Sequence, residues 1–352
     1  MADLTVVVTG SGAPGITGTL YSLKNNFDGR AVRTVGTDTN ANVIGKHLCD
    51  AFHRIASARD ASYVDDLLRV CSMEGADVVV PQNTAELSVL AENRERFRKS
   101  GVRVLVSSPE AIARSNDKHE LLKLAREAGV PFPQFDLVTD WAALVSAAEG
   151  LGWPERAVVV KPPDSNGMRG VRVIDESFDA KAAFFSEKPA SSLTVRMEQL
   201  HYMIGEAFPP LLVTEYLPGE EYTVDVLRAG RVDVVPRRRC QIRSGITFEG
   251  ELSKNDEIIE YSKTLAERTG LKYAFGFQFK FDREGVPKLL ESNPRVQGTM
   301  VLSTFGGANV IYGALKHLLG EAVPPFQVVW GTRLLRYWGG IGLRDGRTVG
   351  SL

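Results

Sequence analysis

Short apolar blocks alternate with segments of helix length through the first hundred residues, and this alternation limits the possible folds more than any other feature. The blocks TVVV, AVRTVGTD, ADVVVP and VRVLVS have the length of buried strands, and amphipathic stretches such as YVDDLLRVCSMEG separate them. Strands that alternate with helices in this way form β-α-β units, in which the strands run parallel. The sequence therefore predicts a Rossmann-like parallel sheet over residues 1–108.

The pattern changes beyond residue 108. A helical segment ends at Gly129, and PFPQ then breaks the chain. A strand, a helix, a strand, a glycine-bearing loop and another strand follow over residues 135–174, and strands with hairpin turns begin at residue 211. We therefore expect a mixed α/β and α+β fold in three parts, which are a parallel-sheet domain over 1–108, a linker helix and small lobe over 109–212, and a C-terminal part over 213–352.

Charge and cysteine content exclude several classes of function. The net charge of -1 offers no field that would attract nucleic acid or an anionic membrane. Three widely spaced cysteines without a CxxC pair argue against a disulfide framework. No apolar run approaches the roughly 20 residues that span a bilayer, and the first residues lack the pattern of a signal peptide. We expect a soluble, cytoplasmic protein that acts on small molecules, without nucleic-acid or membrane partners.

The first turn, VVVTGSGAPGITGTL, is compatible with several functions. Gly10, Gly12 and Gly15 satisfy the GxGxxG pattern between a strand and a helix, and Asp38 ends the next strand, where a ribose-binding acid would lie. However, Pro14 interrupts the turn and removes one backbone donor. The alternatives here are a dinucleotide site, an anion or substrate site, and a purely structural turn. An NAD(P)-dependent oxidoreductase is therefore one functional hypothesis.

Polar residues also follow the strand block ADVVVP, at the end of a sheet where open α/β folds bind ligands. They are Gln82, Asn83, Thr84 and Glu86. These side chains could face an acceptor substrate, with Gly12 of the first turn in the same wall. The alternative is a helix N-cap at Asn83 or Thr84, with Glu86 in the first turn of the helix.

A lysine beside a glycine loop suggests phosphate binding. Lys161 ends the apolar strand AVVVKP, and the loop that follows contains Ser165, Asn166, Gly167 and Gly170. Backbone amides and one point charge can approach phosphate oxygens closely. The alternative is a surface lysine before a β-turn.

Oxygen-bearing side chains on a later hairpin suggest a metal site. Alternation across an antiparallel pair can place Gln278, Glu291 and Asn293 on one face, and such oxygens are the ligands that Mg²⁺ prefers. Arg295 follows and could neutralise charge on a transferring phosphoryl group or an acyl phosphate. The alternatives are an ordinary Asn-Pro turn and a solvent-facing Glu291.

Five motifs in this order resemble the ATP-grasp superfamily, in particular the branch of carbamoyl-phosphate synthase large subunits. They are NDK at 116–118, VVVKP, DSNGMRGV, VTEYLPGEEYTVDV and LLESNPR. The resemblance covers nearly the whole chain. It implies an ATP-grasp fold preceded by a Rossmann-like pre-ATP-grasp domain, with ATP and one or two Mg²⁺ ions as cofactors.

The resemblance also implies a role for individual residues. Lys118 and Lys161 would contact the ATP phosphates, and the DSNGMRG loop would close over them. Glu215, Tyr216 and Leu217 would form the hinge strand, whose backbone contacts adenine. Glu221 would bind the ribose hydroxyls. Gln278, Glu291 and Asn293 would hold Mg²⁺, with Gln278 in a position that is often a carboxylate, so that a second ion would bind more weakly.

We therefore predict an ATP-dependent carboxylate–amine ligase. ATP would phosphorylate a substrate carboxylate, and an amine or similar nucleophile would displace the phosphate. Catalysis is assigned to Lys161, Arg295 and Arg243. Arg243 lies in RSGITFEGELSK, which we expect to form a loop near the site. The alternative for Arg243 is a solvated basic run. The RYWGGIGL segment is expected to pack at a core edge. Other hypotheses are a non-catalytic nucleotide-binding or regulatory subunit and the oxidoreductase, and a homodimer is one option for assembly.

Overall fold

The N-terminal part of the chain folds into the predicted parallel sheet. The computed structural model describes residues 3–164, 168–186 and 193–351. Five parallel strands lie in the order β3-β2-β1-β4-β5 and run Leu4–Val8 (β1), Val32–Asp38 (β2), Ala51–Arg54 (β3), Val78–Val80 (β4) and Arg103–Val104 (β5). The helices of this part are α1 (Ile16–Lys24), α2 (Gly45–Leu48), α3 (Tyr63–Glu74), α4 (Thr84–Glu92) and α5 (Arg94–Lys99). Strand β3 carries no apolar block, so the sequence pattern did not reveal it.

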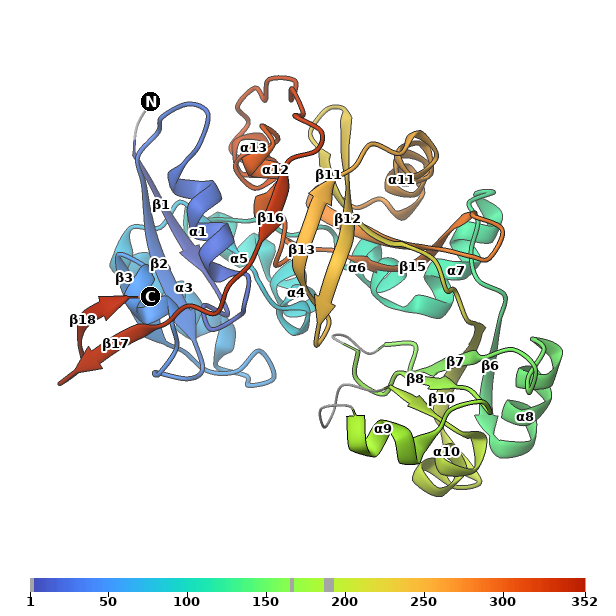
Figure 1. Ribbon diagram of the computed structural model, residues 1–352. Helices are drawn as coiled ribbons and strands as arrows, with labels where there is room; N and C mark the ends of the chain where they lie inside the picture. The colour runs from blue at the N-terminus through green and yellow to red at the C-terminus, as the bar shows by residue number, and fades with distance from the viewer. Residues whose placement is uncertain (1–2, 165–167, 187–192, 352) are drawn as a thin grey trace.

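Two helices lead from this sheet to a small second lobe (Figure 1). They are α6 (Pro109–Asn116) and α7 (Lys118–Glu127), and the side chains of Ser108 and Asp117 cap their N-termini. The lobe has a sheet in the order β6-β10-β7-β8-β9, made of Phe135–Asp140 (β6), Val158–Lys161 (β7), Arg172–Ile174 (β8), Thr194–Val195 (β9) and Ala207–Glu215 (β10). Its helices are α8 (Trp141–Gly150), α9 (Ala180–Ser186) and α10 (Met197–Ile204).

The third sheet is antiparallel and holds much of the hydrophobic core. Its order is β15-β14-β11-β12-β13-β16, with strands Glu221–Arg228 (β11), Val232–Arg243 (β12), Ile246–Leu252 (β13), Tyr273–Phe281 (β14), Pro287–Asn293 (β15) and Arg333–Leu335 (β16). Phe275, Phe277 and Phe279 are fully buried on one face of β14, in a cluster with side chains of α7 and of α11 (Asp256–Thr269). Because side chains alternate along a strand, Gln278 faces the opposite side.

Part of this sheet corrects a sequence expectation. The sequence predicts a loop for RSGITFEGELSK, but this segment forms the end of β12, a turn at Ser244 and Gly245, and the whole of β13. Alternating apolar residues in ITFEGEL give β13 its strand pattern, and its pairing with β12 satisfies the backbone.

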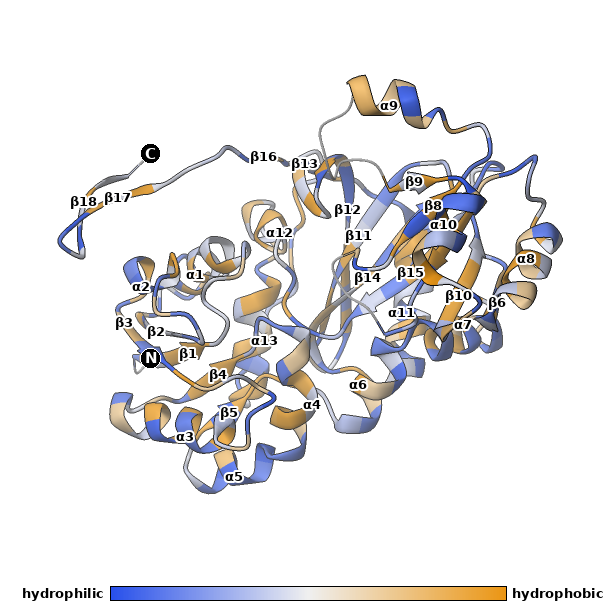
Figure 2. Cartoon of the chain, turned by 90° about the horizontal axis from the view of Figure 1, so that it is seen from below, coloured by the Kyte–Doolittle hydropathy of each residue, from blue (hydrophilic) through white to orange (hydrophobic). Residues whose placement is uncertain are grey.

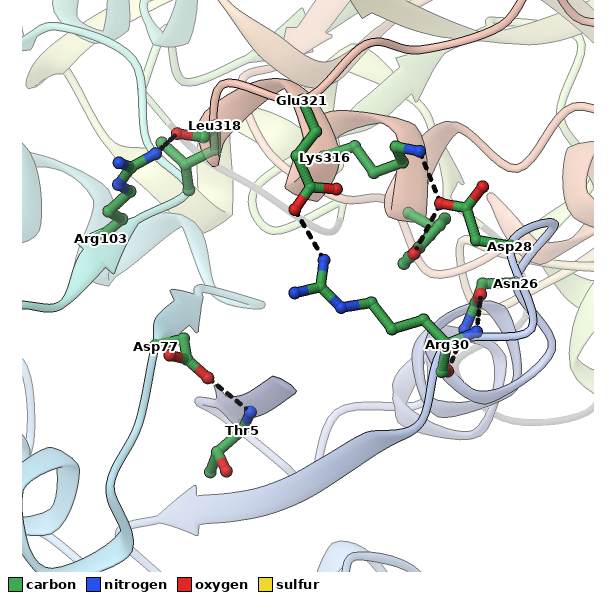
Figure 3. A network of polar contacts seen from close by, with 10 residues as sticks. Thr5, Asn26, Asp28, Arg30, Asp77, Arg103, Lys316, Leu318 and Glu321 are labelled. Atoms are coloured by element: carbon green, nitrogen blue, oxygen red, sulfur yellow. Dashed lines mark hydrogen bonds and ion pairs between the residues drawn. The ribbon is translucent and has the colours of Figure 1, made fainter. Parts of the chain in front are cut away.

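The C-terminal helices join the third sheet to the N-terminal sheet. Helices α12 (Val301–Phe305) and α13 (Val310–Leu318) contact α1, and residues of α13 share one hydrophobic cluster with β1. Polar contacts surround this cluster (Figure 3): Lys316 Nζ lies 2.6 Å from Asp28 Oδ2, and Arg30 pairs with Glu321 at 2.8 Å. The N-terminal sheet and the third sheet are therefore joined through α1, α12 and α13.

The last strands extend away from the rest of the molecule. β17 (Ile341–Arg344) and β18 (Arg347–Ser351) pair only with each other and project from the body (Figures 1 and 2). The expectation that RYWGGIGL packs at a core edge is wrong, because Tyr337 and Trp338 are 77% and 76% exposed beyond the edge strand β16. In the described part of the chain, no helix combines the length and the apolar character needed to span a membrane.

Candidate active site

One large cleft lies where the three sheets meet. Its volume is about 1370 Å³, and its walls come from strand ends and loops of the N-terminal sheet, the small lobe and the third sheet. Most of the predicted site residues line it, namely Gln82, Asn83, Thr84, Glu86, Lys118, Lys161, Glu215, Tyr216, Leu217, Glu221, Gln278, Glu291, Asn293 and Arg295. The fold thus gathers residues that are more than 200 positions apart in the sequence.

Two buried lysines converge near a single carboxylate in this cleft. Lys118 is the first residue of α7, directly after the cap Asp117, and its Nζ lies 3.7 Å from Glu291 Oε2. Lys161 ends β7 and is 7% exposed. Burial and the charge of Lys118 lower the pKa of Lys161 to about 8, although Glu291 opposes the shift. Positive charge therefore exceeds negative charge here, as a polyphosphate site requires.

The predicted metal ligands share one face of the β14–β15 hairpin. Gln278 pairs directly with Glu291, and Asn293 lies two residues further along β15, on the same side of the strand. A register shift follows Gln278, so the regular pairing changes beside the site. Within the described ranges no group of three His, Cys, Asp or Glu side chains gathers, and this candidate set contains one carboxylate and two amides.

The residues assigned to the hinge and the ribose already have partners. The Glu215 carboxylate accepts a hydrogen bond from the backbone N–H of Gln134 and pairs with Lys288. The backbone N–H of Glu215 also donates to the carbonyl of Gln134 at 3.0 Å, so a base would contact the remaining backbone groups of residues 215–217. Glu221 pairs with Arg239, whose guanidinium also donates to Thr247 and to the carbonyl of Gly245. Sequence reasoning did not find this arginine contact.

The glycine loop is only partly described. Ser165, Asn166 and Gly167 lie outside the described residues. Met168 and Arg169 line the large cleft, whereas Gly170 lines a separate cavity of about 470 Å³. Gly170 has φ +73°, and a Cβ there would lie 2.8 Å from the ring of Pro162. The backbone conformation and the close approach of Pro162 thus explain why residue 170 is glycine. Gly170 does not line the large cleft.

The polar residues after β4 form the helix cap that was one of their two alternatives. Asn83 caps α4, and Glu86 accepts a hydrogen bond from its backbone N–H at 3.2 Å. Glu86 is 4% exposed and also accepts from the Tyr63 hydroxyl at 2.7 Å, and burial raises its pKa. Both side chains nevertheless line the cleft, so the cap and a role in the substrate wall are compatible.

The first turn has structural reasons for two of its glycines. Gly10 has φ +56°, a conformation that favours glycine. A Cβ on Gly15 would lie 2.5 Å from the Cα of Gly298, so the backbones touch at this point. Gly12 does not line the cleft, and its N–H donates to Asp38 at 2.8 Å. Asp38 itself lines the cleft, although sequence reasoning connected it only with a dinucleotide.

The arginines of β12 separate into buried and exposed groups. Arg243 does not line the cleft, because it is exposed near the end of β12 and stacks over Phe248. Its predicted catalytic position is therefore not supported, and the solvated alternative fits better. Arg237 is 1% exposed, lines the cleft and pairs with Asp225 at 2.7 Å. The signal for this pair was an acid inside the apolar strand YTVDVL, because a buried charge needs a partner.

Two family models and a curated relative match parts of this chain. A family model described as "ATP-grasp in the biosynthetic pathway with Ter operon" matches residues 207–334, and one described as "PylC-like, N-terminal domain" matches residues 6–105. The carbamoyl phosphate synthase large chain of Clostridium acetobutylicum is 24% identical over 274 residues. That alignment covers 74% of this chain and 24% of the relative, so the chain spans about a quarter of that protein's length.

Solved structures share the fold at low sequence identity. The ADP complex of N5-carboxyaminoimidazole ribonucleotide synthetase has a TM-score of 0.69 and 15% identity, and covers 93% of this chain and 80% of its own. A β-γ-ATP complex of biotin carboxylase from Campylobacter jejuni has a TM-score of 0.66 and 20% identity, with 91% and 72% covered. The predicted fold class is confirmed, and the family models agree with the predicted ATP-grasp resemblance over residues 207–334 and with a PylC-like N-terminal domain over residues 6–105.

Proposed function

We propose that the protein is an ATP-dependent ligase that activates a carboxylate as an acyl phosphate and joins it to an amine or similar nucleophile. The observation that carries this proposal is the pair of buried lysines beside Glu291, with Gln278 and Asn293 on the same hairpin face. Two cations and three oxygen-bearing side chains form a suitable environment for a triphosphate and its metal ion.

The nucleotide would lie between the small lobe and the third sheet. Lys118 and Lys161 would contact its phosphates, and the backbone of residues 215–217 would contact its base. Glu221 would bind the ribose in exchange for its contact with Arg239. The solved structures that share the fold include an ADP complex and an ATP-analogue complex, which supports an adenine nucleotide in the equivalent region of this chain.

The residues present fit a magnesium ion. Gln278, Glu291 and Asn293 offer oxygens only, which suits a hard cation, and the cleft wall leaves room for phosphate oxygens beside them. When bound, the ion would neutralise charge on the phosphates. Because only one of the three ligands is a carboxylate, we expect modest affinity in the absence of nucleotide.

Arg295 would assist the chemical step. It lies two residues beyond Asn293, lines the cleft and donates from Nε to Thr84 at 3.1 Å. A carboxylate oxygen of the substrate would attack the γ-phosphorus, and ADP would leave. The amine would then attack the acyl carbon, lose a proton and expel phosphate. The guanidinium would stabilise negative charge on the carboxylate and on the acyl phosphate, and the small lobe would help to exclude water.

The test measures whether the purified protein releases ADP from ATP when a carboxylic acid substrate is added. We expect Lys161→Met and Glu291→Gln each to lower kcat/KM by about 100-fold or more, the typical loss for a group that stabilises transition-state charge. Lys263→Met is the matched control, since Lys263 is an exposed lysine paired with Glu260 on α11. If the protein binds ATP but releases no ADP with any member of a broad panel of carboxylates and amines, the result would instead support a non-catalytic nucleotide-binding subunit.

A further inference from the structure

Three charged side chains that line the cleft have no partner of opposite charge within 4.0 Å among the described residues. Asp38 accepts hydrogen bonds from the backbone N–H groups of Gly12 and Asn40, but no described cation lies within ion-pair distance of it. Arg295 and Arg336 donate to a hydroxyl and to backbone carbonyls, and neither has a carboxylate within 4.0 Å in the described ranges. All three line the cleft.

Two of these side chains contact the same part of the cleft wall, the first turn. The Asp38 carboxylate accepts a hydrogen bond from the N–H of Gly12. Arg336 donates to the carbonyls of Pro14 at 3.5 Å and Gly298 at 2.7 Å. Gly12 and Pro14 are two residues apart, so their Cα atoms are separated by at most about 7 Å. Arg295 extends the wall toward the metal ligands, since it follows β15. The negative and positive charges thus flank the same turn.

The positive end of this wall also carries unused donors. Nε of Arg336 and of Arg237 and Nε2 of Gln82 are buried and have no hydrogen-bond partner among the described residues. Gln82 is 6% exposed and Arg237 is 1% exposed, and both line the cleft. Burial and the nearby charge of Arg237 lower the pKa of Arg336. Buried donors and an unpaired cation are costly unless a ligand satisfies them, so this end is built for an anion.

We propose that the molecule activated here is an amino acid, bound with its carboxylate at Arg295 and Arg336 and its ammonium group at Asp38. This inference rests on the proposed ligase function and names the substrate class. The carboxylate is the group that becomes phosphorylated, because Arg295 lies beside the metal ligands. The ammonium group stays protonated on Asp38 and takes no part in the reaction. A second molecule supplies the nucleophile.

Other substrate classes fit the wall less well. A simple monocarboxylic acid would leave the charge of Asp38 unmatched at the cleft. A substrate with a phosphate group in place of the ammonium group would be repelled by Asp38. Because Asp38 and Arg336 contact backbone groups of one short turn, a small molecule that carries both charges suits the site.

The test traps the acyl phosphate with hydroxylamine, which displaces phosphate and forms a hydroxamate. The hydroxamate is then measured as its coloured complex with iron. Each L- and D-amino acid is compared with the acid of the same chain that lacks the amino group, for example alanine with propanoate. We expect a preference in kcat/KM of about 100-fold or more for the best amino acid, since a site that pairs a polar group rejects analogues without it.

The variant Asp38→Asn separates the ammonium contact from other effects. Its amide oxygen can still accept from Gly12, but the hydrogen bond from Asn40 to the other oxygen is lost, so we expect the fold to be retained with a slightly lower thermal unfolding midpoint. The kcat/KM preference for the amino acid over the desamino acid should fall at least tenfold, through a higher KM for the amino acid. Asp65→Asn is the control, because Asp65 is an exposed acid on α3, with 68% of its side chain accessible.

The possible results are distinguishable. An unchanged preference in Asp38→Asn, or turnover of desamino acids in place of amino acids, would overturn the amino-acid inference while the ligase function stands. If ATP binds but no acid of either kind yields hydroxamate, the proposed function fails together with this inference.

Discussion

At the scale of single residues, Lys161 shows how burial changes the chemistry of a side chain. Its place at the end of an apolar strand was visible in the sequence, but its pKa depends on Lys118 and Glu291, which come from other parts of the chain. A lysine with a pKa of about 8 is partly neutral in mildly alkaline solution. A nearby polyphosphate would favour the charged form and raise this pKa again.

We therefore expect nucleotide binding to be accompanied by proton uptake above pH 8. A group with a pKa of about 8 is about three quarters deprotonated at pH 8.5, so binding should take up as much as that fraction of a proton. At pH 7 the lysine is already mostly protonated and uptake should be small. Isothermal titration calorimetry in buffers of different ionisation enthalpy measures this number. Lys161→Met should abolish the uptake, and persistence of the uptake in that variant would assign it to another group.

At the scale of elements, the periodicity of the sequence predicted which residues share one face of a strand, but it did not predict how the elements contact one another. Strand alternation placed Gln278, Glu291 and Asn293 on one face, and the structure agrees with that arrangement. The same reasoning missed β3, which lacks an apolar block, and misread β13 as a loop. It could not locate Arg243 or Arg336 relative to the cleft, because their positions depend on where β12 and β16 end. Pairing registers and strand ends follow from packing in three dimensions, which one sequence does not display.

The contact between Gly15 and Gly298 is an element-scale feature that can be tested. A Cβ at Gly15 would meet the Cα of Gly298 at 2.5 Å, so Gly15→Ala must displace the turn or the loop after β15. We expect a loss of about 1–3 kcal/mol in the free energy of unfolding, as for other overpacked sites. Chemical denaturation provides the measurement.

Gly150→Ala is the matched control for this substitution. Gly150 ends α8, and nothing lies within 4 Å of the position that a Cβ would take. Alanine there should be neutral or stabilise by about 0.5–1 kcal/mol, because it favours helix more than glycine does. Equal stability of the two variants would show that the backbones of residues 15 and 298 do not touch in solution.

At the scale of the whole molecule, the N-terminal sheet and the third sheet share a core, whereas the small lobe has its own hydrophobic cluster. The family resemblance predicted the presence of these parts, but the contacts that join them were not predictable. Asp28 and Lys316 are 288 residues apart in sequence, and neither belongs to a recognisable motif. This packing makes one wall of the cleft from two sheets, and it leaves the small lobe as the part attached by fewer contacts.

A double-mutant cycle on Asp28 and Lys316 tests whether this junction stabilises the molecule. The pair is largely buried, with side chains 15% and 9% exposed, and Tyr312 also donates to Asp28 at 3.0 Å. From Asp28→Asn, Lys316→Met and the double variant we expect a coupling of about 1.5–3 kcal/mol, the range for hydrogen bonds to charged groups. The exposed pair Lys24–Asp50, with both side chains about 40% accessible, should give about 0–1 kcal/mol.

The pH dependence of the coupling identifies its cause. Burial alone would raise the pKa of Asp28, but hydrogen bonds from Lys316 and Tyr312 outweigh it and lower the pKa below the usual 3.8. A carboxylate with a lowered folded-state pKa contributes stability above its unfolded pKa, and loses that contribution as the pH falls through the folded value. The coupling measured by chemical denaturation should therefore be constant from pH 8 to pH 5. A coupling that already declines across this interval would mean that Asp28 is not held as an ion by Lys316, and that the shared hydrophobic core alone joins the two sheets.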